Sequence, residues 1–222
     1  MKEENIMKYN TILFDLDGTL LYTLEDLTDS INYMLDKYGL PTHSLEDIRR
    51  FVGNGLRMLV IRALPDGENY ENFEEFLKEF IEYYNCHNLI KTRPYDGIME
   101  TTKKLKDLGI KMAIVTNKGQ TASESLLEDF FKPNINIVIG DDGNHPRKPA
   151  PAPIEMALKE LNVTDKSTVL YVGDSEVDAA TAENSGLDYV LCTYGFRDMD
   201  DLKDFHPVAY VDNIAKLLDV LQ

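Results

Sequence analysis

The stretch Thr11-Ile12-Leu13-Phe14-Asp15-Leu16-Asp17-Gly18-Thr19-Leu20 decides the fold, because it places two acidic residues directly after an apolar run. Ile12 to Phe14 is typical of a short buried strand, and the change to Asp15 and Asp17 marks where that strand leaves the core. Carboxylates at positions i and i+2 of an extended backbone point to the same side. Two like charges held so close repel unless one is protonated or a cation lies between them. We therefore expect a hard divalent ion at this turn.

Two ordinary explanations compete with a catalytic one for Asp-x-Asp-Gly, since the pattern also occurs in simple turns and in calcium loops. No Glu follows Asp15 at calcium-loop spacing, and the preceding apolar run disfavours a calcium site within a loop. From these residues alone, the simple turn stays open. The rest of the chain has to decide between a turn and a catalytic site.

The composition indicates a globular protein and argues against binding to nucleic acid or to membranes. With 222 residues, 43% of them hydrophobic, the chain can bury a substantial core as one large domain or as a domain with an insert. The 23 basic and 39 acidic residues leave a net charge of -16, which opposes non-specific attraction to nucleic acid or an anionic membrane. A small phosphorylated metabolite is still a possible partner, because nearby cations and a metal can outweigh a distant field that salt screens within about 10 Å.

The cysteines and the N-terminus indicate a cytoplasmic protein. Cys86 and Cys192 lie far apart without metal-ligand spacing, so we expect free thiols in a reducing compartment. Residues 1–5 are charged, and no long apolar segment follows them, which argues against a signal peptide or a membrane span. No pattern in the sequence indicates an oligomeric state.

The region from Leu24 to about Asn88 is expected to be all helical. Apolar residues recur there at spacings of three and four, Gly39 and Pro41 end the first stripe, and Ser44 with Asp47 indicates a helix cap. The expected helices cover 24–38, 44–51, 56–64 and 73–84, with Gly53-Asn54-Gly55 as the break between the second and third.

From Pro94 onward the pattern changes to alternating strands and helices, which predicts a parallel sheet. The expected strands are Met112–Thr116, Ile135–Ile139, Val169–Val172, Tyr189–Cys192 and Val208–Val211. The expected helices are Ile98–Leu108, Thr121–Phe130, Pro153–Leu161, Val177–Ser185 and Asn213–Leu221. The simplest architecture is one α/β domain, formed by residues 1–20 and 91–222, with residues 21–90 as a helical insert. Ligands in open α/β sheets bind beyond the carboxyl ends of the strands, so the insert should overhang Asp15.

Three further polar clusters follow later apolar runs. Thr116 and Asn117 end the strand that starts at Met112, Lys148 lies in a proline-rich approach to a helix, and Asp174 and Asp178 follow the strand from Val169. Taken alone, each has an ordinary explanation: a turn, a solvated lysine, or acids at a helix N-terminus. For Glu176 we prefer the ordinary explanation outright.

The four clusters, in this order, resemble the motifs of the haloacid dehalogenase superfamily of phosphohydrolases, in which Asp-x-Asp-Gly-Thr ends the first strand. The matching residues are Asp15, Asp17, Gly18, Thr19, Thr116, Asn117, Lys148, Asp174 and Asp178. The resemblance spans the whole chain and implies a Rossmann-like parallel sheet core with an inserted all-helical cap domain. Ala150 departs from the pattern, because family members often carry an acidic residue there, but this position only flanks the lysine.

The resemblance also implies a mechanism. Asp15 would attack phosphorus to give an aspartyl-phosphate, and Asp17 would protonate the leaving oxygen and later accept a proton from water. Lys148 would offset negative charge, while Gly18, Thr116 and Asn117 would bind the phosphoryl group. Mg²⁺ is the expected cofactor, held by the Asp15 carboxylate, the Asp17 backbone carbonyl and Asp174. Asp178 would bind the ion through water or orient Lys148.

Other local matches concern the substrate. At position 19 the chain resembles the phosphatases, because it carries threonine where sugar phosphomutases more often carry valine. The runs Phe51–Gly55, Arg93–Gly97 and Thr193–Phe196 look most like phosphoglycolate phosphatases, which implies 2-phosphoglycolate as the substrate. A β-phosphoglucomutase-like sugar phosphomutase or a pyrophosphatase shares much of the pattern. A non-catalytic phosphate-binding protein would be expected to lose Asp15, Asp17 or Lys148, yet all three are present.

The break at Gly53-Asn54-Gly55 supplies a candidate substrate contact. If the insert overhangs the metal, Asn54 at a helix N-terminus or Arg57 could hold an anionic group of the substrate. The alternative is that the glycines merely separate two helices and that Arg57 is solvated.

Overall fold

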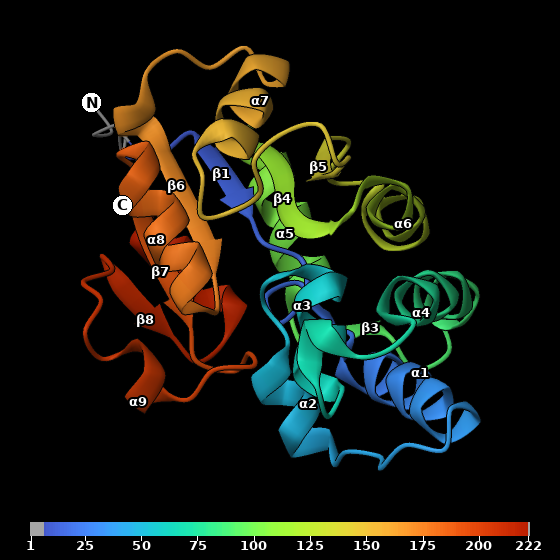
Figure 1. Cartoon of the computed structure of the whole chain (residues 1–222). Coiled ribbons are helices and arrows are strands. Elements are labelled where there is room, and N and C mark those ends of the chain that lie inside the picture. The colour runs from blue at the N-terminus through green and yellow to red at the C-terminus, as the bar shows by residue number, and fades with distance from the viewer. Residues whose placement is uncertain (1–6, 222) are drawn as a thin grey trace, which may run out of the picture.

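The structure, a computed structural model, describes residues 7–221, so the charged stretch 1–5 noted above lies outside the described residues. The strands of the main sheet are β1 (Thr11–Phe14), β4 (Lys111–Gly119), β5 (Val138–Asp141), β6 (Val169–Gly173), β7 (Asp188–Cys192) and β8 (Ala209–Val211). They pair in parallel in the order β5-β4-β1-β6-β7-β8 (Figure 1). The predicted α/β class with a parallel sheet is confirmed.

Strand β1 lies inside the sheet because its side chains are apolar on both faces. Ile12 and Phe14 belong to the apolar cluster on one face, and Leu13 belongs to the cluster on the other. The strand pairs with β4 on one side and with β6 on the other, so Thr11 lies opposite both Lys111 and Val169. Successive side chains of a strand point to opposite faces, which gives the sheet two apolar layers to cover.

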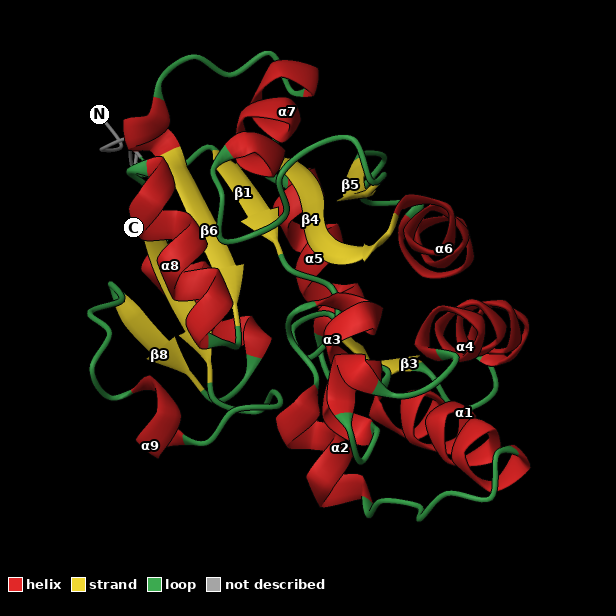
Figure 2. Cartoon of the chain, viewed as in Figure 1, coloured by secondary structure: helices red, strands yellow, loops and turns green. Residues whose placement is uncertain are grey.

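Helices cover both faces of the sheet (Figure 2). One layer includes α5 (Ile98–Asp107), α6 (Gln120–Leu126) and α10 (Leu217–Val220), and the other includes α7 (Ala152–Glu160) and α8 (Glu176–Ser185). The short α9 (Met199–Leu202) follows β7. Lys8 donates from its backbone N–H to the Leu221 carbonyl at 3.0 Å, so the two ends of the described chain lie side by side.

The helices of the insert are α1 (Leu24–Lys37), α2 (Leu45–Phe51), α3 (Gly55–Ala63) and α4 (Phe73–His87). They bury an apolar cluster of their own, and Phe196 is its one buried member from outside the insert among the described residues. Two short strands that the sequence pattern did not indicate, β2 (Leu21–Tyr22) and β3 (Arg93–Pro94), pair antiparallel where the chain enters and leaves the insert. The predicted helix cap is confirmed, because Ser44 and Asp47 form a capping box at α2.

Several boundaries differ from the predicted ones for local reasons. The strand expected from Ile135 begins at Val138, because the Ile135 N–H donates to the Phe131 carbonyl at 2.8 Å and belongs to the preceding turn. The helix expected over Thr121–Phe130 ends as a π-helix, Leu127–Phe131. The helix expected over Asn213–Leu221 starts as a 3-10 turn at Ile214–Lys216, and further 3-10 turns are Gly67–Asn69 and Lys166–Thr168. Within residues 7–221, no helix has both the length and the apolar character that crossing a membrane requires.

Candidate active site

The acidic residues emerge together at the carboxyl edge of the sheet. Asp15 follows β1, and its N–H donates to the Val172 carbonyl of β6 at 2.8 Å, which continues the strand pairing by one residue. Asp174 follows β6, next to it. Thr116 lies toward the carboxyl end of β4, on the other side of β1. Parallel strands therefore bring these side chains to one place, the edge at which open α/β sheets bind ligands.

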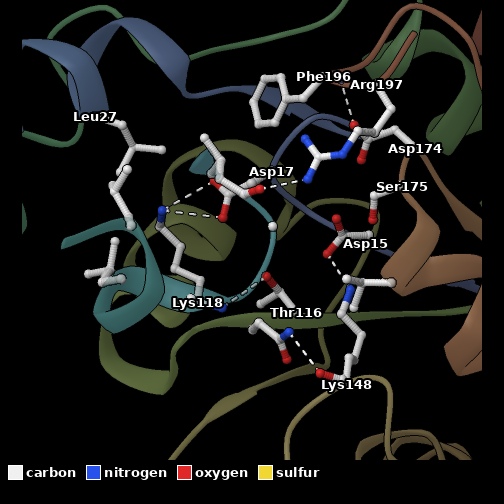
Figure 3. Close-up of a pocket in the computed structure, with 17 residues that line it drawn as sticks. Asp15, Asp17, Leu27, Thr116, Lys118, Lys148, Asp174, Ser175, Phe196 and Arg197 are labelled. Atoms are coloured by element: carbon white, nitrogen blue, oxygen red, sulfur yellow. Dashed lines mark hydrogen bonds and ion pairs between the residues drawn. The ribbon is translucent and has the colours of Figure 1, made fainter. Parts of the chain in front are cut away.

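A cavity lies between this edge and the helical insert (Figure 3). The sheet side contributes Asp15, Asp17, Thr116, Asn117, Lys118, Lys148, Asp174, Ser175, Val177, Phe196 and Arg197. The insert contributes Leu27, Val52, Gly53, Gly55, Leu56 and Leu59. The insert therefore contributes an apolar wall to the cavity, and the edge of the sheet contributes a charged floor, as expected for an insert that overhangs the site.

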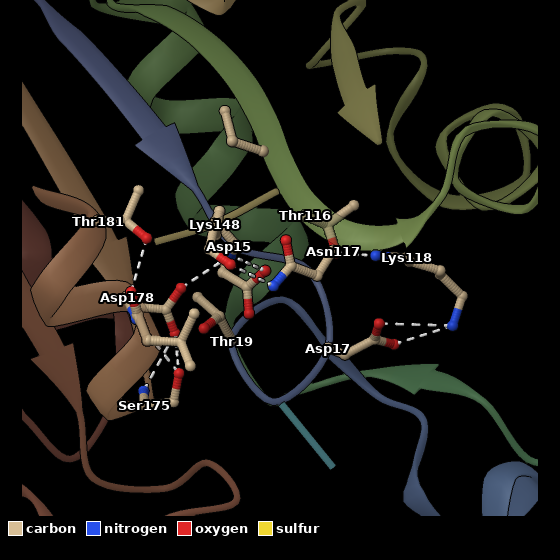
Figure 4. Close-up of polar contacts among 12 residues, drawn as sticks. Asp15, Asp17, Thr19, Thr116, Asn117, Lys118, Lys148, Ser175, Asp178 and Thr181 are labelled. Atoms are coloured by element: carbon tan, nitrogen blue, oxygen red, sulfur yellow. Dashed lines mark hydrogen bonds and ion pairs between the residues drawn. The ribbon is translucent and has the colours of Figure 1, made fainter. Parts of the chain in front are cut away.

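Lys148 lies at the centre of the charged floor, with its side chain 3% exposed. Its ammonium donates to Asp15 Oδ1 at 2.7 Å and to Asp178 Oδ1 at 2.8 Å (Figure 4). It also donates to the Tyr171 hydroxyl at 2.9 Å. A lysine ammonium has three N–H donors, so every donor of Lys148 has a partner. The ordinary explanation of a solvated lysine therefore does not hold, because Lys148 is buried against Asp15.

Asp178 combines two of the roles considered for it. Its Oδ1 accepts from Lys148, as expected of a residue that orients the lysine. Its Oδ2 accepts from the Ser175 hydroxyl at 2.6 Å and from the N–H groups of Ser175 and Asp174 at 3.1 and 3.2 Å, which forms a capping box at the start of α8. One carboxylate therefore fixes both the helix and the lysine.

Asp174 is held by residues from distant parts of the chain. Its Oδ1 accepts from the Thr19 hydroxyl at 3.2 Å, and its Oδ2 accepts from the Phe196 N–H at 2.7 Å. Glycines permit this approach, because a Cβ on Gly195 would lie 2.3 Å from Asp174 Cβ and a Cβ on Gly18 would lie 2.4 Å from Asp174 Oδ2. The backbone of Gly18 also has a φ of 91°, which side-chain-bearing residues rarely adopt.

Burial and mutual repulsion control the charges of the cluster. Burial, together with the Asp178 carboxylate, raises the pKa of Asp15 to about 7 despite its contact with Lys148. Burial and the carboxylates of Asp178 and Asp15 raise the pKa of Asp174 well above its usual range. Burial also acts to raise the pKa of Asp178, but the Lys148 ammonium outweighs it and lowers that pKa. Two of these three buried carboxylates, Asp15 and Asp178, share the Lys148 ammonium.

A divalent cation fits this cluster by its donor chemistry. Asp15, Asp174 and Asp178 can each offer a carboxylate oxygen, and these oxygens lie within 4.8 Å of one another. Hard cations such as Mg²⁺ prefer carboxylate and carbonyl oxygens. Asp178 accepts from Lys148, Tyr171, the Ser175 hydroxyl and two backbone N–H groups. Asp174 accepts two hydrogen bonds and Asp15 accepts one from Lys148, so these two carboxylates have fewer bonds to give up to an ion. The raised pKa values of Asp15 and Asp174 show that ionising both is costly, and a cation between them would offset that cost.

Asp17 faces a second buried lysine rather than the acidic cluster. Lys118 Nζ donates to Asp17 Oδ1 and Oδ2 at 3.2 and 3.4 Å and to the Tyr84 hydroxyl of α4 at 2.6 Å. The Lys118 side chain is 2% exposed. Asp17 and the helical insert are therefore connected through one ammonium.

Arg197 joins the same cavity from the segment after β7. It pairs with Glu176 through Nε at 2.7 Å and donates to the backbone carbonyls of Val52 at 2.7 Å and Arg49 at 3.2 Å. In return, Arg49 donates to the Phe196 carbonyl and pairs with Asp198 at 2.7 Å. Two arginines therefore connect the insert with the segment after β7.

The structure brings most of the predicted site residues together. Asp15, Asp17, Thr116, Asn117, Lys148 and Asp174 line the cavity, while Gly18 and Asp178 support them from behind. Asn117 donates its amide to the Lys148 carbonyl at 3.1 Å, and its buried Oδ1 has no hydrogen-bond partner within residues 7–221.

The expectation that Asn54 and Arg57 face the substrate is not supported, because neither lines the cavity. The Arg57 guanidinium pairs with Glu68 and Glu74, each at 2.8 Å, and lies 4.7 Å from the centre of the Phe73 ring. Asn54 precedes α3 and makes no side-chain capping bond. Their neighbours Val52, Gly53 and Gly55 line the cavity instead.

Sequence reasoning assigned no role to Lys118, Arg197 or Tyr84. Lys118 follows Thr-Asn directly, and Arg197 follows the Thr193–Phe196 run, so a charged residue just after a strand-end motif was the available signal. Tyr84 had no such signal, because its place in the apolar stripe of α4 looks like that of a core residue.

Comparisons with known proteins identify the family of this chain. Residues 12–192 match the family model described as haloacid dehalogenase-like hydrolase. The chain is 35% identical to phosphoglycolate phosphatase 1 of Pseudomonas aeruginosa, over 93% of this chain and 78% of that protein, and 33% identical to a phosphoglycolate phosphatase of Psychrobacter arcticus, over 97% and 96%. The crystal structure of a predicted phosphoglycolate phosphatase from Haemophilus somnus superposes with a TM-score of 0.90 at 29% identity, covering 98% of this chain and 100% of that one. The chain therefore belongs to the haloacid dehalogenase-like hydrolase family, as the order of its four polar motifs predicted.

Proposed function

We propose that this enzyme, a phosphatase of the haloacid dehalogenase-like family, hydrolyses 2-phosphoglycolate through an aspartyl-phosphate on Asp15. The observation that carries the reaction type is the buried pair of Asp15 and Lys148, 2.7 Å apart at the end of β1, in a cavity that also contains Asp17. The names of the relatives support the substrate, because they are phosphoglycolate phosphatases matched over most of the chain.

In the first step, a carboxylate oxygen of Asp15 forms a bond to phosphorus while the bond from phosphorus to the ester oxygen breaks. Asp17 gives its proton to the departing ester oxygen, so glycolate leaves with a neutral hydroxyl group at that oxygen. Lys148 lies against Asp15 and offsets the negative charge that gathers there. The Thr116 hydroxyl, which lines the cavity, and the backbone near Gly18 would bind the oxygens of the phosphoryl group.

In the second step, Asp17 takes a proton from water, and the water oxygen attacks phosphorus. The bond between phosphorus and the Asp15 carboxylate breaks, which releases inorganic phosphate and restores the carboxylate. The apolar wall from Leu27, Leu56 and Leu59 limits the water that reaches the site, so a bound ester is protected from side reactions.

Mg²⁺ is the cofactor that we propose, with the carboxylates of Asp15 and Asp174 and the Asp17 backbone carbonyl as its protein ligands. When bound, it supplies positive charge that screens the approach of an anionic nucleophile to an anionic phosphate. The buried acidic cluster supports this assignment, since Asp15 and Asp174 both have raised pKa values without a cation.

We also propose that residues 1–20 and 91–222 form the catalytic core and that residues 21–90 form a cap. The separate apolar cluster of α1 to α4 supports this division. A sugar phosphomutase or a pyrophosphatase of the same superfamily is the alternative activity. A mutase would need an activating bisphosphate and would give no net phosphate release, so one assay separates it.

The test is phosphate release by the purified protein with and without MgCl₂, first from p-nitrophenyl phosphate and then from a panel of small esters, a hexose phosphate and pyrophosphate. The proposal expects magnesium-dependent release and the highest kcat/KM for 2-phosphoglycolate. A higher kcat/KM for pyrophosphate, or sugar-phosphate interconversion that requires a bisphosphate, would replace it with the corresponding alternative.

A further inference from the structure

Three side chains that line the cavity carry a positive charge. Lys148 uses its three N–H groups on Asp15, Asp178 and Tyr171. Arg197 uses four of its five N–H groups on Glu176 and on two backbone carbonyls of the insert. A new anion in the cavity would have to break buried contacts to bind Lys148, and it could use at most one N–H group of Arg197 without breaking a contact.

Lys118 is the third cation, and it differs in two ways. Its ammonium donates to both oxygens of Asp17 and to the Tyr84 hydroxyl, so a single carboxylate takes two of its three contacts. Its distances to the two Asp17 oxygens, 3.2 and 3.4 Å, are longer than the usual 2.7–2.9 Å of charge-assisted hydrogen bonds. Lys118 is therefore the cation whose existing hydrogen bonds a second carboxylate can replace most easily.

We propose that Lys118 binds the carboxylate of the substrate's leaving group, an inference that rests on the proposed 2-phosphoglycolate phosphatase function. The contact with Asp17 already shows that this ammonium holds a carboxylate in the buried cavity. A substrate carboxylate would replace one of the two Asp17 oxygens on the ammonium. A neutral leaving group would find no such partner.

The position of Lys118 fits the short span of the substrate. In 2-phosphoglycolate one methylene separates the ester oxygen from the carboxyl carbon, so the carboxylate oxygens lie within about 4 Å of the ester oxygen. The ester oxygen must lie beside Asp17, which protonates it. Lys118 Nζ is 3.2 Å from Asp17 Oδ1, so it lies in the shell that the substrate carboxylate can reach.

Tyr84 ties this recognition to the helical insert. Its hydroxyl is 2.6 Å from Lys118 Nζ, its ring centre is 4.7 Å from the same atom, and its side chain is fully buried. Tyr84 belongs to α4, whereas Lys118 belongs to β4. The ammonium is therefore fixed where sheet and insert meet, and a carboxylate moved out of water to this point needs that fixed cation as a partner.

The competing explanation is that Lys118 only positions Asp17 for proton transfer. The two explanations differ in the substrates that they affect. A positioning lysine supports the hydrolysis of every ester to the same degree. A carboxylate-binding lysine favours esters with a charged carboxylate over esters of the same shape without the charge.

The test compares 2-phosphoglycolate with its neutral amide, 2-phosphoglycolamide, in wild type and in Lys118→Gln. Glutamine keeps a donor for Asp17 or Tyr84 but removes the charge. We expect kcat/KM for 2-phosphoglycolate to fall about 10- to 100-fold, the scale of a charged hydrogen bond, and kcat/KM for the amide to fall less than about 3-fold. Lys78→Met on α4, an exposed position, is the matched control and should change neither value.

Equal losses for the two substrates in Lys118→Gln would overturn the proposal in favour of positioning. A variant that keeps wild-type kcat/KM for both substrates would overturn the proposal as well. A wild type that does not prefer 2-phosphoglycolate over the amide would instead refute the proposed substrate, and would be seen before any variant is made. If Lys118→Gln does not fold, as judged by its thermal melt, Lys118→Met is measured against the same pair of substrates with the same expected and opposing outcomes.

Discussion

Arg49 of α2 and Arg197 after β7 each donate to the backbone of the segment that carries the other. Arg197 Nη1 reaches the carbonyl of Arg49 at 3.2 Å, and Arg49 Nη1 reaches the carbonyl of Phe196. These bonds join the helical insert to the sheet beside the cavity, because Phe196 and Arg197 both line it. The position of the insert over the site therefore depends on two guanidinium groups.

Replacing Arg197 should loosen the insert. Arg197→Ala removes charged hydrogen bonds to Val52 and Arg49 and leaves Glu176 without its partner, so we expect a loss of about 1.5–3 kcal/mol in the free energy of unfolding. Urea unfolding measures that loss, and hydrogen exchange of the α2 amides should become faster. Arg50→Ala, in which an exposed arginine loses contact with Glu46, is the control and should cost less than about 0.5 kcal/mol. Exchange rates at α2 that match wild type would contradict this role for Arg197.

Asp15→Asn should abolish phosphate release, because the amide keeps the shape of the side chain but is no comparable nucleophile. The fold should be retained, since β1 pairs through its backbone with β4 and β6. Measurement of kcat at saturating magnesium, alongside the circular dichroism spectrum, checks both statements. Turnover within about tenfold of wild type would remove Asp15 from the nucleophile role, because a lost nucleophile costs far more than that.

Asp17→Asn should act on the leaving group. Without a proton donor, alkyl esters should lose most of their activity, whereas p-nitrophenyl phosphate, whose leaving group departs without protonation, should keep more of it. The ratio of kcat/KM for the two ester classes is the measurement. If alkyl and nitrophenyl esters lose activity to the same extent, Asp17 is not the acid.

Gly195→Ala should disturb the acidic cluster, because the new Cβ would lie 2.3 Å from Asp174 Cβ and 2.4 Å from its Oδ2. Overpacking of a filled site typically costs about 1–3 kcal/mol, and the displaced carboxylate should also weaken the response to magnesium. Thermal melts with and without MgCl₂ report both effects. Gly119→Ala is the control, since a Cβ there meets no atom within 4 Å. Equal melting temperatures and magnesium responses for both variants would show that the contact with Asp174 can relax.

The metal-free protein should lose stability as the pH rises from about 4 to about 7. Burial and Asp178 raise the pKa of folded Asp15 from 3.8 to about 7, so the folded state keeps a proton that the unfolded state has released in this window. Asp174 shifts in the same direction. The lowered pKa of Asp178 acts below this window and does not cancel the trend.

Magnesium should offset that loss, because a cation that binds only the folded state stabilises it by mass action. We expect added MgCl₂ to raise the melting temperature more at about pH 8 than at about pH 5, where Asp15 and Asp174 carry protons. Asp15→Asn should show a weaker pH dependence in the metal-free protein. A magnesium response of equal size at both pH values would contradict the charge assignment of the cluster.

The sequence predicted the parts of the molecule that follow from local chemistry. Apolar runs that end in acids gave β1 and β6 together with Asp15 and Asp174, and the Ser44-Asp47 spacing gave the cap of α2. Because ligands in open α/β sheets bind beyond the carboxyl ends of the strands, these side chains were expected to lie in one cavity.

The parts that escaped prediction depend on contacts between distant segments. The Lys118–Tyr84 bond joins residues of two different elements 34 positions apart, and no local pattern reveals it. Arg57 shows the opposite error: a cation near a glycine break suggested an anion site, yet two nearby glutamates pair with it. Local spacing identifies which residues can react, but long-range packing determines which charges face the cavity.

The central position of β1 also has a consequence for how the chain is made. This strand leaves the ribosome before every other strand of the main sheet, but its partners begin only at Lys111 in β4 and at Val169 in β6. The insert, with its own apolar cluster, is complete well before either partner exists. Domains generally fold as units from the N-terminus during synthesis, so the helices can pack while Thr11–Phe14 still awaits neighbours. The strand that precedes Asp15 is thus the first strand of the sheet to be synthesised and among the last to find its pairing strands. Its unpaired backbone edges are therefore the part of the sheet most exposed to pairing with other nascent chains.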